Sequence, residues 1–113
     1  MKVLICGDRN YSNKEKIRNV IRNLMPDEVI TGGASGADTL AEQCCKEDGF
    51  KVHVEKAKWE LYHRAAGPIR NRKMLDMKPD LVVAFHSDLS KSKGTKDTVT
   101  EAKRRCIKVI LYV

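Results

Sequence analysis

The sequence has few aromatic residues, no long apolar run and no block of like charges. Phenylalanine, tryptophan and tyrosine together make up 5% of the 113 residues. No apolar stretch approaches the roughly 20 residues that a membrane-spanning helix needs, so we expect no membrane partner. The hydrophobic fraction of 42% is typical of a globular protein and argues against disorder. We therefore expect a single domain over residues 1–113.

Metal and disulfide frameworks have no basis in the sequence. The four cysteines form no Cys-x-x-Cys pair, and no histidine-rich spacing accompanies them. We expect neither a bound metal nor another cofactor. Cys6 and Cys106 lie within or beside apolar runs, where a free thiol behaves as a small hydrophobic side chain. The short apolar run after Lys2 leads directly into a charged turn, which argues against a signal peptide and favours a cytoplasmic protein.

What the sequence does have is an excess of positive charge. The net charge of +7 suggests an anionic partner, such as a nucleotide or a nucleic acid. The basic residues are dispersed along the chain, without a run of five or six like charges. Nucleic acid is therefore the less favoured of these two partners.

Short apolar runs alternate with longer amphipathic segments. This alternation predicts an α/β fold of the Rossmann-like, doubly wound kind, with about five mostly parallel strands in the order 3-2-1-4-5 and helices on both faces. Residues 55–67 show no clear period. The predicted strands are 3–6, 28–31, 50–54, 81–85 and 109–112, and the predicted helices begin near residues 14, 37, 68 and 95.

A glycine-rich turn over residues 31–38 is the first candidate site. A strand runs directly into Gly32, Gly33 and Gly36, and a helix follows, so backbone N–H groups and the helix dipole can meet a phosphate. The spacing matches neither Gly-x-Gly-x-x-Gly nor a Walker A sequence, which argues against a standard NAD or ATP-hydrolysing site. The alternative is a tight structural turn.

Three further segments are predicted to reach the same edge of the sheet, where doubly wound folds bind ligands. Arg9 follows the first strand directly. Arg70, Asn71 and Arg72 lie within one helical turn, where arginine suits phosphate and asparagine suits a ribose hydroxyl or a base edge. For the adjacent Lys73 we favour a solvated helix face.

The third segment is Lys93-Gly94-Thr95, at the start of the last predicted helix, where an anion is stabilised unless Thr95 acts only as a cap.

Trp59, Tyr62 and His63 form the single aromatic cluster. A ring there could stack on a base. For Trp59 packing in the core is the favoured interpretation, and Tyr62 and His63 are left open. No role is given to His53 or His86.

Five motifs follow one another along the chain. They are Gly7-x-Arg9, Gly32-Gly33-Ala34-x-Gly36-Ala37-Asp38, Trp59-x-x-Tyr62, Ala66-Gly67-Pro68-x-Arg70-Asn71 and Gly94-Thr95. Together they resemble the YspA-type, YpsA-related branch of the SLOG superfamily, which is distantly similar to the lonely-guy phosphoribohydrolases and to the DNA-processing protein DprA. The resemblance implies a Rossmann-like fold, binding of nucleotide-derived signals (ADP-ribose-like or cyclic ones included), a homo-oligomer, and a setting of phage–bacterial conflict.

The enzymatic branch of that superfamily pairs Arg-Lys with Pro-Gly-Gly-x-Gly-Thr-x-x-Glu. Arg72-Lys73 matches the first element, but Thr98 stands where the glutamate belongs. Asp97 is one residue early, which turns it by about 100° on a helix. A phosphoribohydrolase needs such a carboxylate. Arg72 and Asp97 are therefore the catalytic candidates, and binding is favoured over hydrolysis.

Three hypotheses follow. The leading one is a sensor or sequestering protein that binds a phosphate-containing nucleotide derivative. The first alternative is a nucleotide N-glycosidase that uses Arg72 with Asp97 or Asp38, and the second is a nucleic-acid-binding protein. The predicted ligand-binding residues are Gly7, Arg9, Gly32, Gly33, Ala34, Ser35, Gly36, Asp38, Trp59, Tyr62, Arg70, Asn71, Arg72, Gly94 and Thr95.

Overall fold

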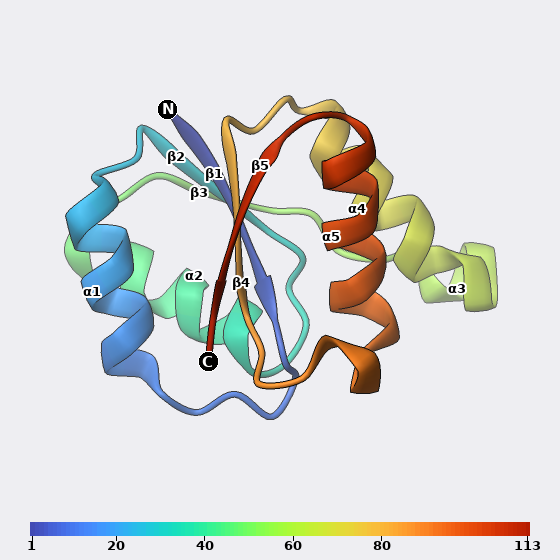
Figure 1. The fold of residues 1–113 in the computed structure, drawn as a ribbon, viewed down its shortest axis with the longest axis horizontal. Coiled ribbons are helices and arrows are strands. Elements are labelled where there is room, and N and C mark those ends of the chain that lie inside the picture. Colours follow the sequence, from blue (N-terminus) through green and yellow to red (C-terminus); the bar gives the residue numbers. More distant parts are fainter.

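The chain is built around a parallel five-stranded sheet with strand order β3-β2-β1-β4-β5 (Figure 1). The computed structural model describes residues 1–113. The strand order and the helices on both faces confirm the predicted Rossmann-like class. The elements are β1 (Lys2–Gly7), α1 (Lys14–Leu24), β2 (Glu28–Thr31), α2 (Ala37–Asp48), β3 (Val52–Val54), α3 (Trp59–Tyr62), α4 (Ala66–Asp76), β4 (Leu81–Phe85), α5 (Lys93–Arg104) and β5 (Lys108–Tyr112), with 3-10 turns at His63–Ala65 and Leu89–Lys91.

Alternate residues of β1 divide the core into two halves. Val3 and Ile5 pack with the apolar residues of α1 and α2 on one face of the sheet. Leu4 and Cys6 pack with α4 and α5 on the other face, and Figure 1 shows the two helix pairs on opposite sides of the strands. A central strand covered on both faces reads as a continuous apolar run, which is the pattern that residues 3–6 have. None of the helices combines the length and apolar character that crossing a membrane requires.

Two helices begin earlier than their sequence signals predict. The N-terminal cap of α5 is Ser92, whose Oγ accepts the N–H of Thr95 at 3.1 Å, so Thr95 lies inside the helix and is not its cap. The helix α4 begins at Ala66, two residues before the expected start at Pro68. Both differences arise because the first turn of a helix tolerates proline and glycine. Since these residues carry no apolar periodicity, the sequence pattern places the start of each helix too late.

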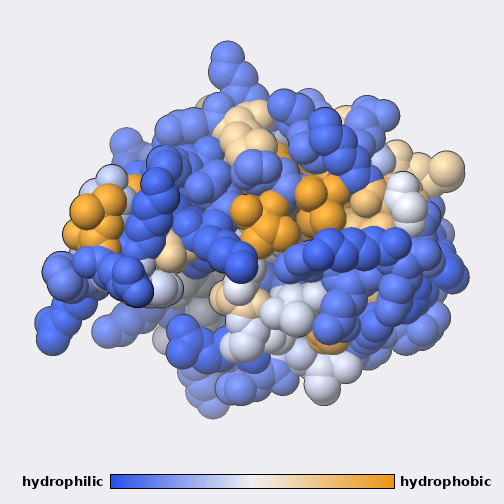
Figure 2. Space-filling view, turned by 180° about the vertical axis from the view of Figure 1, so that it is seen from behind, coloured by the Kyte–Doolittle hydropathy of each residue, from blue (hydrophilic) through white to orange (hydrophobic).

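The segment over residues 55–67 corrects two further expectations. It contains α3, a short helix that projects from the body of the molecule in Figure 1. Trp59 was expected in the core but is 56% exposed, because α3 lies outside both halves of the core. Cys106, expected to be a packed apolar side chain, is exposed at a turn of positive φ after α5. Figure 2 shows that the rear face is mainly hydrophilic and carries only separate, small apolar clusters.

A close backbone crossing joins the end of β1 to the start of α2. A Cβ on Gly36, whose φ is +76°, would lie 2.2 Å from the carbonyl oxygen of Asp8. A Cβ on Gly7 would lie 2.4 Å from the carbonyl oxygen of Phe85 and 2.7 Å from Cβ of Ala37. The Ala37 N–H donates to the Asp8 carbonyl at 3.1 Å across this crossing. Only glycine fits both positions, since it has no Cβ, and at Gly36 its tolerance of positive φ is needed as well.

Replacing Gly36 tests this crossing against a matched glycine. Gly49 has a similar φ of +78°, but a Cβ there would meet no atom within 4 Å. Gly49→Ala should therefore cost only backbone strain, roughly 1 kcal/mol. We expect Gly36→Ala to lower the free energy of unfolding at least roughly twice as much, because it adds overlap with a carbonyl. Urea titration followed by circular dichroism measures both, and equal losses would contradict the steric argument.

Candidate functional site

Two adjoining cavities lie beyond the carboxyl ends of the strands. The first, named here the switch-point cavity, has a volume of about 490 Å³ and lies between the end of β1, the start of α2 and the segment that joins β4 to α5. The second, the α3 cavity, has a volume of about 540 Å³ and lies between residues 32–34 and the segment over residues 56–68. This edge of the sheet is the one at which doubly wound folds bind their ligands.

The two cavities share one wall that is rich in positive charge. Its cations come from three different parts of the chain, and no acidic residue belongs to it. Lys91 adds charge to the switch-point cavity, and Lys56 and Arg64 add charge to the α3 cavity. Cations gathered around a concave surface attract an anion. The shared wall consists of Arg9, Ala34, Arg70, Asn71, Lys93 and Gly94.

Most of the predicted ligand-binding residues lie at these cavities. The switch-point cavity is lined by Gly7, Arg9, Ala34, Asp38, Arg70, Asn71, Gly94 and Thr95. The α3 cavity is lined by Gly32, Gly33 and Trp59, and it shares Arg9, Ala34, Arg70, Asn71 and Gly94. Ser35, Gly36, Tyr62 and Arg72 line neither cavity.

Arg70 and Asn71 tie the segments of the site together. Arg70 Nη1 donates to the carbonyl oxygen of Gly32 at 2.6 Å, and its Nε donates to Asn71 Oδ1 at 2.9 Å. Asn71 Nδ2 donates to Asp97 Oδ2 at 3.0 Å and lies 3.4 Å from the carbonyl oxygen of Gly94. This chain of hydrogen bonds links the glycine-rich turn, α4 and the start of α5. Asn71 is buried, its amide N–H groups point at Asp97 and Gly94, and its Oδ1 accepts from Arg70, so only the second lone pair of Oδ1 is left for the predicted contact with a ribose or a base.

The two catalytic candidates belong to one polar cluster on the side of this network. Arg72 Nη1 lies 3.3 Å from Asp97 Oδ2, and its Nη2 lies 3.9 Å from a carboxylate oxygen of Glu101. Asp97 lines the α3 cavity but already accepts hydrogen bonds from Asn71 and Arg72. Both side chains therefore have partners within the protein.

The start of α5 is open at Gly94. A Cβ on Gly94 would meet no atom within 4 Å, and the residue lies at the wall of both cavities. The first N–H groups of a helix lack partners within the helix and favour negative charge. A ligand can therefore approach this helix end without meeting a side chain at residue 94.

Asp38 is a buried carboxyl group on the floor of the switch-point cavity. Its Oδ2 accepts the N–H of Ala34 at 3.2 Å, whereas its Oδ1 has no hydrogen-bond partner. Burial raises the pKa of Asp38 to about 6, although the Ala34 hydrogen bond and the positive charge of Arg70 act in the opposite direction. The carboxyl group thus titrates close to neutral pH inside a cavity.

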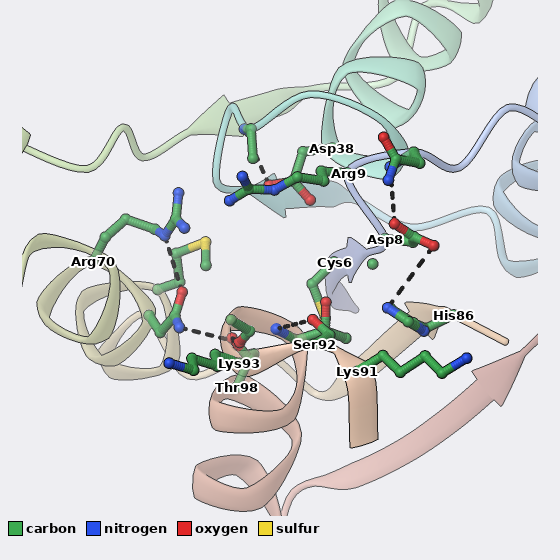
Figure 3. Close-up of a pocket in the computed structure, with 17 residues that line it drawn as sticks. Cys6, Asp8, Arg9, Asp38, Arg70, His86, Lys91, Ser92, Lys93 and Thr98 are labelled. Atoms are coloured by element: carbon green, nitrogen blue, oxygen red, sulfur yellow. Dashed lines mark hydrogen bonds and ion pairs between the residues drawn. The ribbon is translucent and has the colours of Figure 1, made fainter. Parts of the chain in front are cut away.

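Asp8 and His86 are not among the predicted site residues, yet they lie next to each other in the lining of the switch-point cavity (Figure 3). His86 Nδ1 accepts the N–H of Asp88 at 2.9 Å, so the ring proton of the neutral histidine resides on Nε2. That nitrogen lies 3.9 Å from Asp8 Oδ2. Asp8 directly follows β1 and His86 directly follows β4, so both lie at the carboxyl ends of strands, where Arg9 is also predicted to lie. That placement is the signal in the sequence that could have found them.

The fold and the site define a doubly wound α/β protein with cation-lined cavities at the switch point of its sheet. The chain belongs to the YspA, cpYpsA-related SLOG family, whose model matches residues 1–62. The Gene 61 protein of Mycobacterium phage D29 is 33% identical over 125 aligned positions, which cover 98% of this chain and 95% of that protein.

A solved structure supports the fold. The DNA processing protein A (DprA) of Streptococcus pneumoniae superposes with a TM-score of 0.63 at 16% sequence identity. The match covers 98% of this chain but only 58% of the DprA chain. At this level of identity the similarity concerns the architecture alone.

The pKa of Asp38 predicts how stability changes with pH. The folded protein holds this proton up to about pH 6, whereas the unfolded chain releases it near 3.8. Because the folded state binds the proton more tightly, this contribution to stability is present below pH 4 and is lost as the pH rises to about 6. Relative to Asp38→Asn, the wild type should lose roughly 3 kcal/mol of unfolding free energy over this interval.

Asp88→Asn is the control for this measurement. Hydrogen bonds from Ser90 lower the pKa of Asp88, so the Asp88 contribution is lost as the pH falls, the opposite direction. Urea unfolding at a series of pH values gives each difference profile. Parallel curves for the wild type and Asp38→Asn between pH 4 and 7 would contradict the assignment to Asp38.

Proposed function

We propose that this protein binds a phosphate-containing nucleotide or nucleotide-derived signal in the two cavities, as a sensor or a sequestering protein. The observation that carries the proposal is the shared wall, where Arg9, Arg70 and Lys93 surround the open helix end at Gly94. Guanidinium forks, an ammonium group and free backbone N–H groups are the donors that phosphate prefers.

The phosphate would lie nearer to α5 than to the centre of the glycine-rich turn. Within that turn the Ala34 N–H is already taken by Asp38, and the Gly32 carbonyl is taken by Arg70. At α5, Ser92 caps the N–H of Thr95 alone, and no side chain at Gly94 covers the rest of the helix end. The turn then forms one side of the phosphate site, through Ala34, and supports the position of Arg70.

The exposed indole of Trp59 offers a stacking surface for the base of the nucleotide in the α3 cavity. The indole rests on α4, where a Cβ on Gly67 would lie 3.4 Å from its Cη2 atom. With 56% of its surface exposed, the ring leaves area on which a planar base can stack. A base on Trp59 and a phosphate at the shared wall are compatible with ADP-ribose-like or cyclic nucleotide ligands. Similarity to a phage protein supports a role in phage–bacterial conflict.

Hydrolysis of an N-glycosidic bond is the second candidate, and Asp38 is the residue that favours it. Its carboxyl group titrates near pH 6 inside the switch-point cavity, as a general acid or base requires. Asp97 is less suited, since it is held by Asn71 and Arg72. Incubation with nucleoside monophosphates and chromatography of the products separates the two candidates, because free base appears only if the bond is cleaved.

Lys93→Ala tests the phosphate site. We expect it to weaken binding of the tightest-binding nucleotide roughly tenfold, because one charged partner of the phosphate is removed. The matched control is Lys103→Ala, an exposed lysine in the last turn of the same helix that lines neither cavity. Isothermal titration calorimetry against nucleoside mono- and diphosphates, ADP-ribose and its cyclic isomers measures both.

Equal affinities of the two lysine variants would contradict the phosphate site. A folded wild-type sample that binds no member of the panel would overturn nucleotide binding altogether. If the protein instead shifts single-stranded DNA with an affinity that falls steeply with salt, nucleic-acid binding replaces it.

Gly94→Ala separates binding from stability. A Cβ at this position enters open space, and alanine in a helix is more favourable than glycine, so stability should rise by roughly 0.5–1 kcal/mol. The same methyl group occupies the approach to the helix end, so nucleotide affinity should fall. Thermal unfolding without ligand and calorimetry with it measure the two effects, and unchanged affinity would show that no ligand group lies at Gly94.

A further inference from the structure

Two carboxylates line the switch-point cavity although its surroundings are cationic. Asp8 directly follows β1, Asp38 lies in the first turn of α2, and both face the same space as Arg70 and Ser92 (Figure 3). A carboxylate repels a phosphate, but it is a strong acceptor for a hydroxyl group. The cavity therefore suits a ligand that presents hydroxyl groups beside its phosphate.

The unpartnered oxygen of Asp38 is the strongest sign of a missing donor. Asp38 lines the cavity but is only 6% exposed, and its Oδ1 has no hydrogen-bond partner and almost no exposed surface, so a donor from the cavity reaches it after a small side-chain movement at the floor. A buried polar atom without a partner costs free energy, and nearly all such atoms in folded proteins are paired. Oδ2 alone supports the turn through Ala34, so a neutral asparagine would serve that structural purpose as well. The second, charged oxygen is left for a donor that the protein does not supply.

Asp8 and His86 form a second, incomplete pair. Asp8 Oδ1 accepts the N–H of Asn10 at 2.9 Å, while Asp8 Oδ2 and His86 Nε2 lie 3.9 Å apart, beyond hydrogen-bond distance. Nε2 carries the proton because Nδ1 is occupied by the N–H of Asp88. A hydroxyl group between them can accept from Nε2 and donate to Oδ2, which satisfies both.

We propose that the ribose of the bound nucleotide lies in the switch-point cavity and donates its hydroxyl groups to Asp38 and Asp8, so that the protein selects ribonucleotides over deoxyribonucleotides. This inference rests on the proposed nucleotide binding. The sequence pattern assigned the sugar to Asn71, but the Asn71 amide forms hydrogen bonds within the protein. The inference assigns the sugar instead to Asp38 and Asp8, each of which has a carboxylate oxygen without a hydrogen-bond partner.

The experiment compares each ribonucleotide with its 2′-deoxy and 3′-deoxy forms by isothermal titration calorimetry. For the wild type, loss of a hydroxyl group that donates to a carboxylate should weaken binding roughly tenfold to a hundredfold. The ratio of ribonucleotide affinity to deoxynucleotide affinity measures this preference. Asp38→Asn and Asp8→Asn should each bring the ratio for one hydroxyl group, 2′ or 3′, close to one, chiefly by weakening the binding of the ribonucleotide. The matched control is Asp76→Asn, which removes a carboxylate that pairs with Arg105 and lines neither cavity, and which should leave both ratios unchanged.

The outcomes separate this inference from the function on which it rests. Binding of ribonucleotides and both deoxy forms with equal affinity overturns the inference and leaves nucleotide binding intact. Ratios that persist in both Asp38→Asn and Asp8→Asn overturn the assignment to these carboxylates. If no nucleotide binds the folded wild type, the proposed function and the inference both fail. If Asp38→Asn does not fold, the affinity ratios of the wild type and of Asp8→Asn still test whether the protein recognises the ribose hydroxyl groups.

Discussion

The close crossing of β1 and α2 determines how the floor of the switch-point cavity is built. Because Gly7 and Gly36 have no side chains, the end of β1, the end of β4 and the start of α2 meet within hydrogen-bond distance. The backbone of Asp8 and Arg9 then lies against the start of α2, and Asp8, Arg9 and Asp38 line the same cavity. A side chain at either glycine would push these segments apart and open the floor of the cavity to water.

A second constraint fixes the sides of the site. Arg70 and Asn71 bind backbone and side-chain groups of both flanking segments, so α4 acts as a brace between the glycine-rich turn and α5. These two residues resemble ligand contacts in the sequence, because arginine and asparagine are common in nucleotide sites. In the folded chain the hydrogen bonds of Asn71 hold α4 against α5. Arg70 holds the glycine-rich turn with one N–H group and still faces both cavities.

The charges of the site are segregated in a way that suits a nucleotide. Cations dominate the shared wall, two carboxylates line the part of the switch-point cavity outside that wall, and the exposed indole of Trp59 borders the α3 cavity. Phosphate, sugar and base each need one of these environments. Membership of the YspA, cpYpsA-related SLOG family agrees with nucleotide-related binding, while the departures at Thr98 and Asp97 favour a binding protein over a phosphoribohydrolase.

The sequence by itself determined the class of fold, the strand order and the four segments at the ligand edge, because apolar periodicity and glycine turns are local properties. Only the tertiary structure decided that Trp59 is exposed, that the Asn71 amide bonds within the protein, that Asp38 has an unpartnered oxygen and that Asp8 lies next to His86. These features depend on contacts between residues far apart in the chain, such as Arg70 with Gly32. A local sequence pattern carries no information about such partners. The exposure of a side chain, its hydrogen-bond partners and its pKa are therefore known only once the segments are packed together.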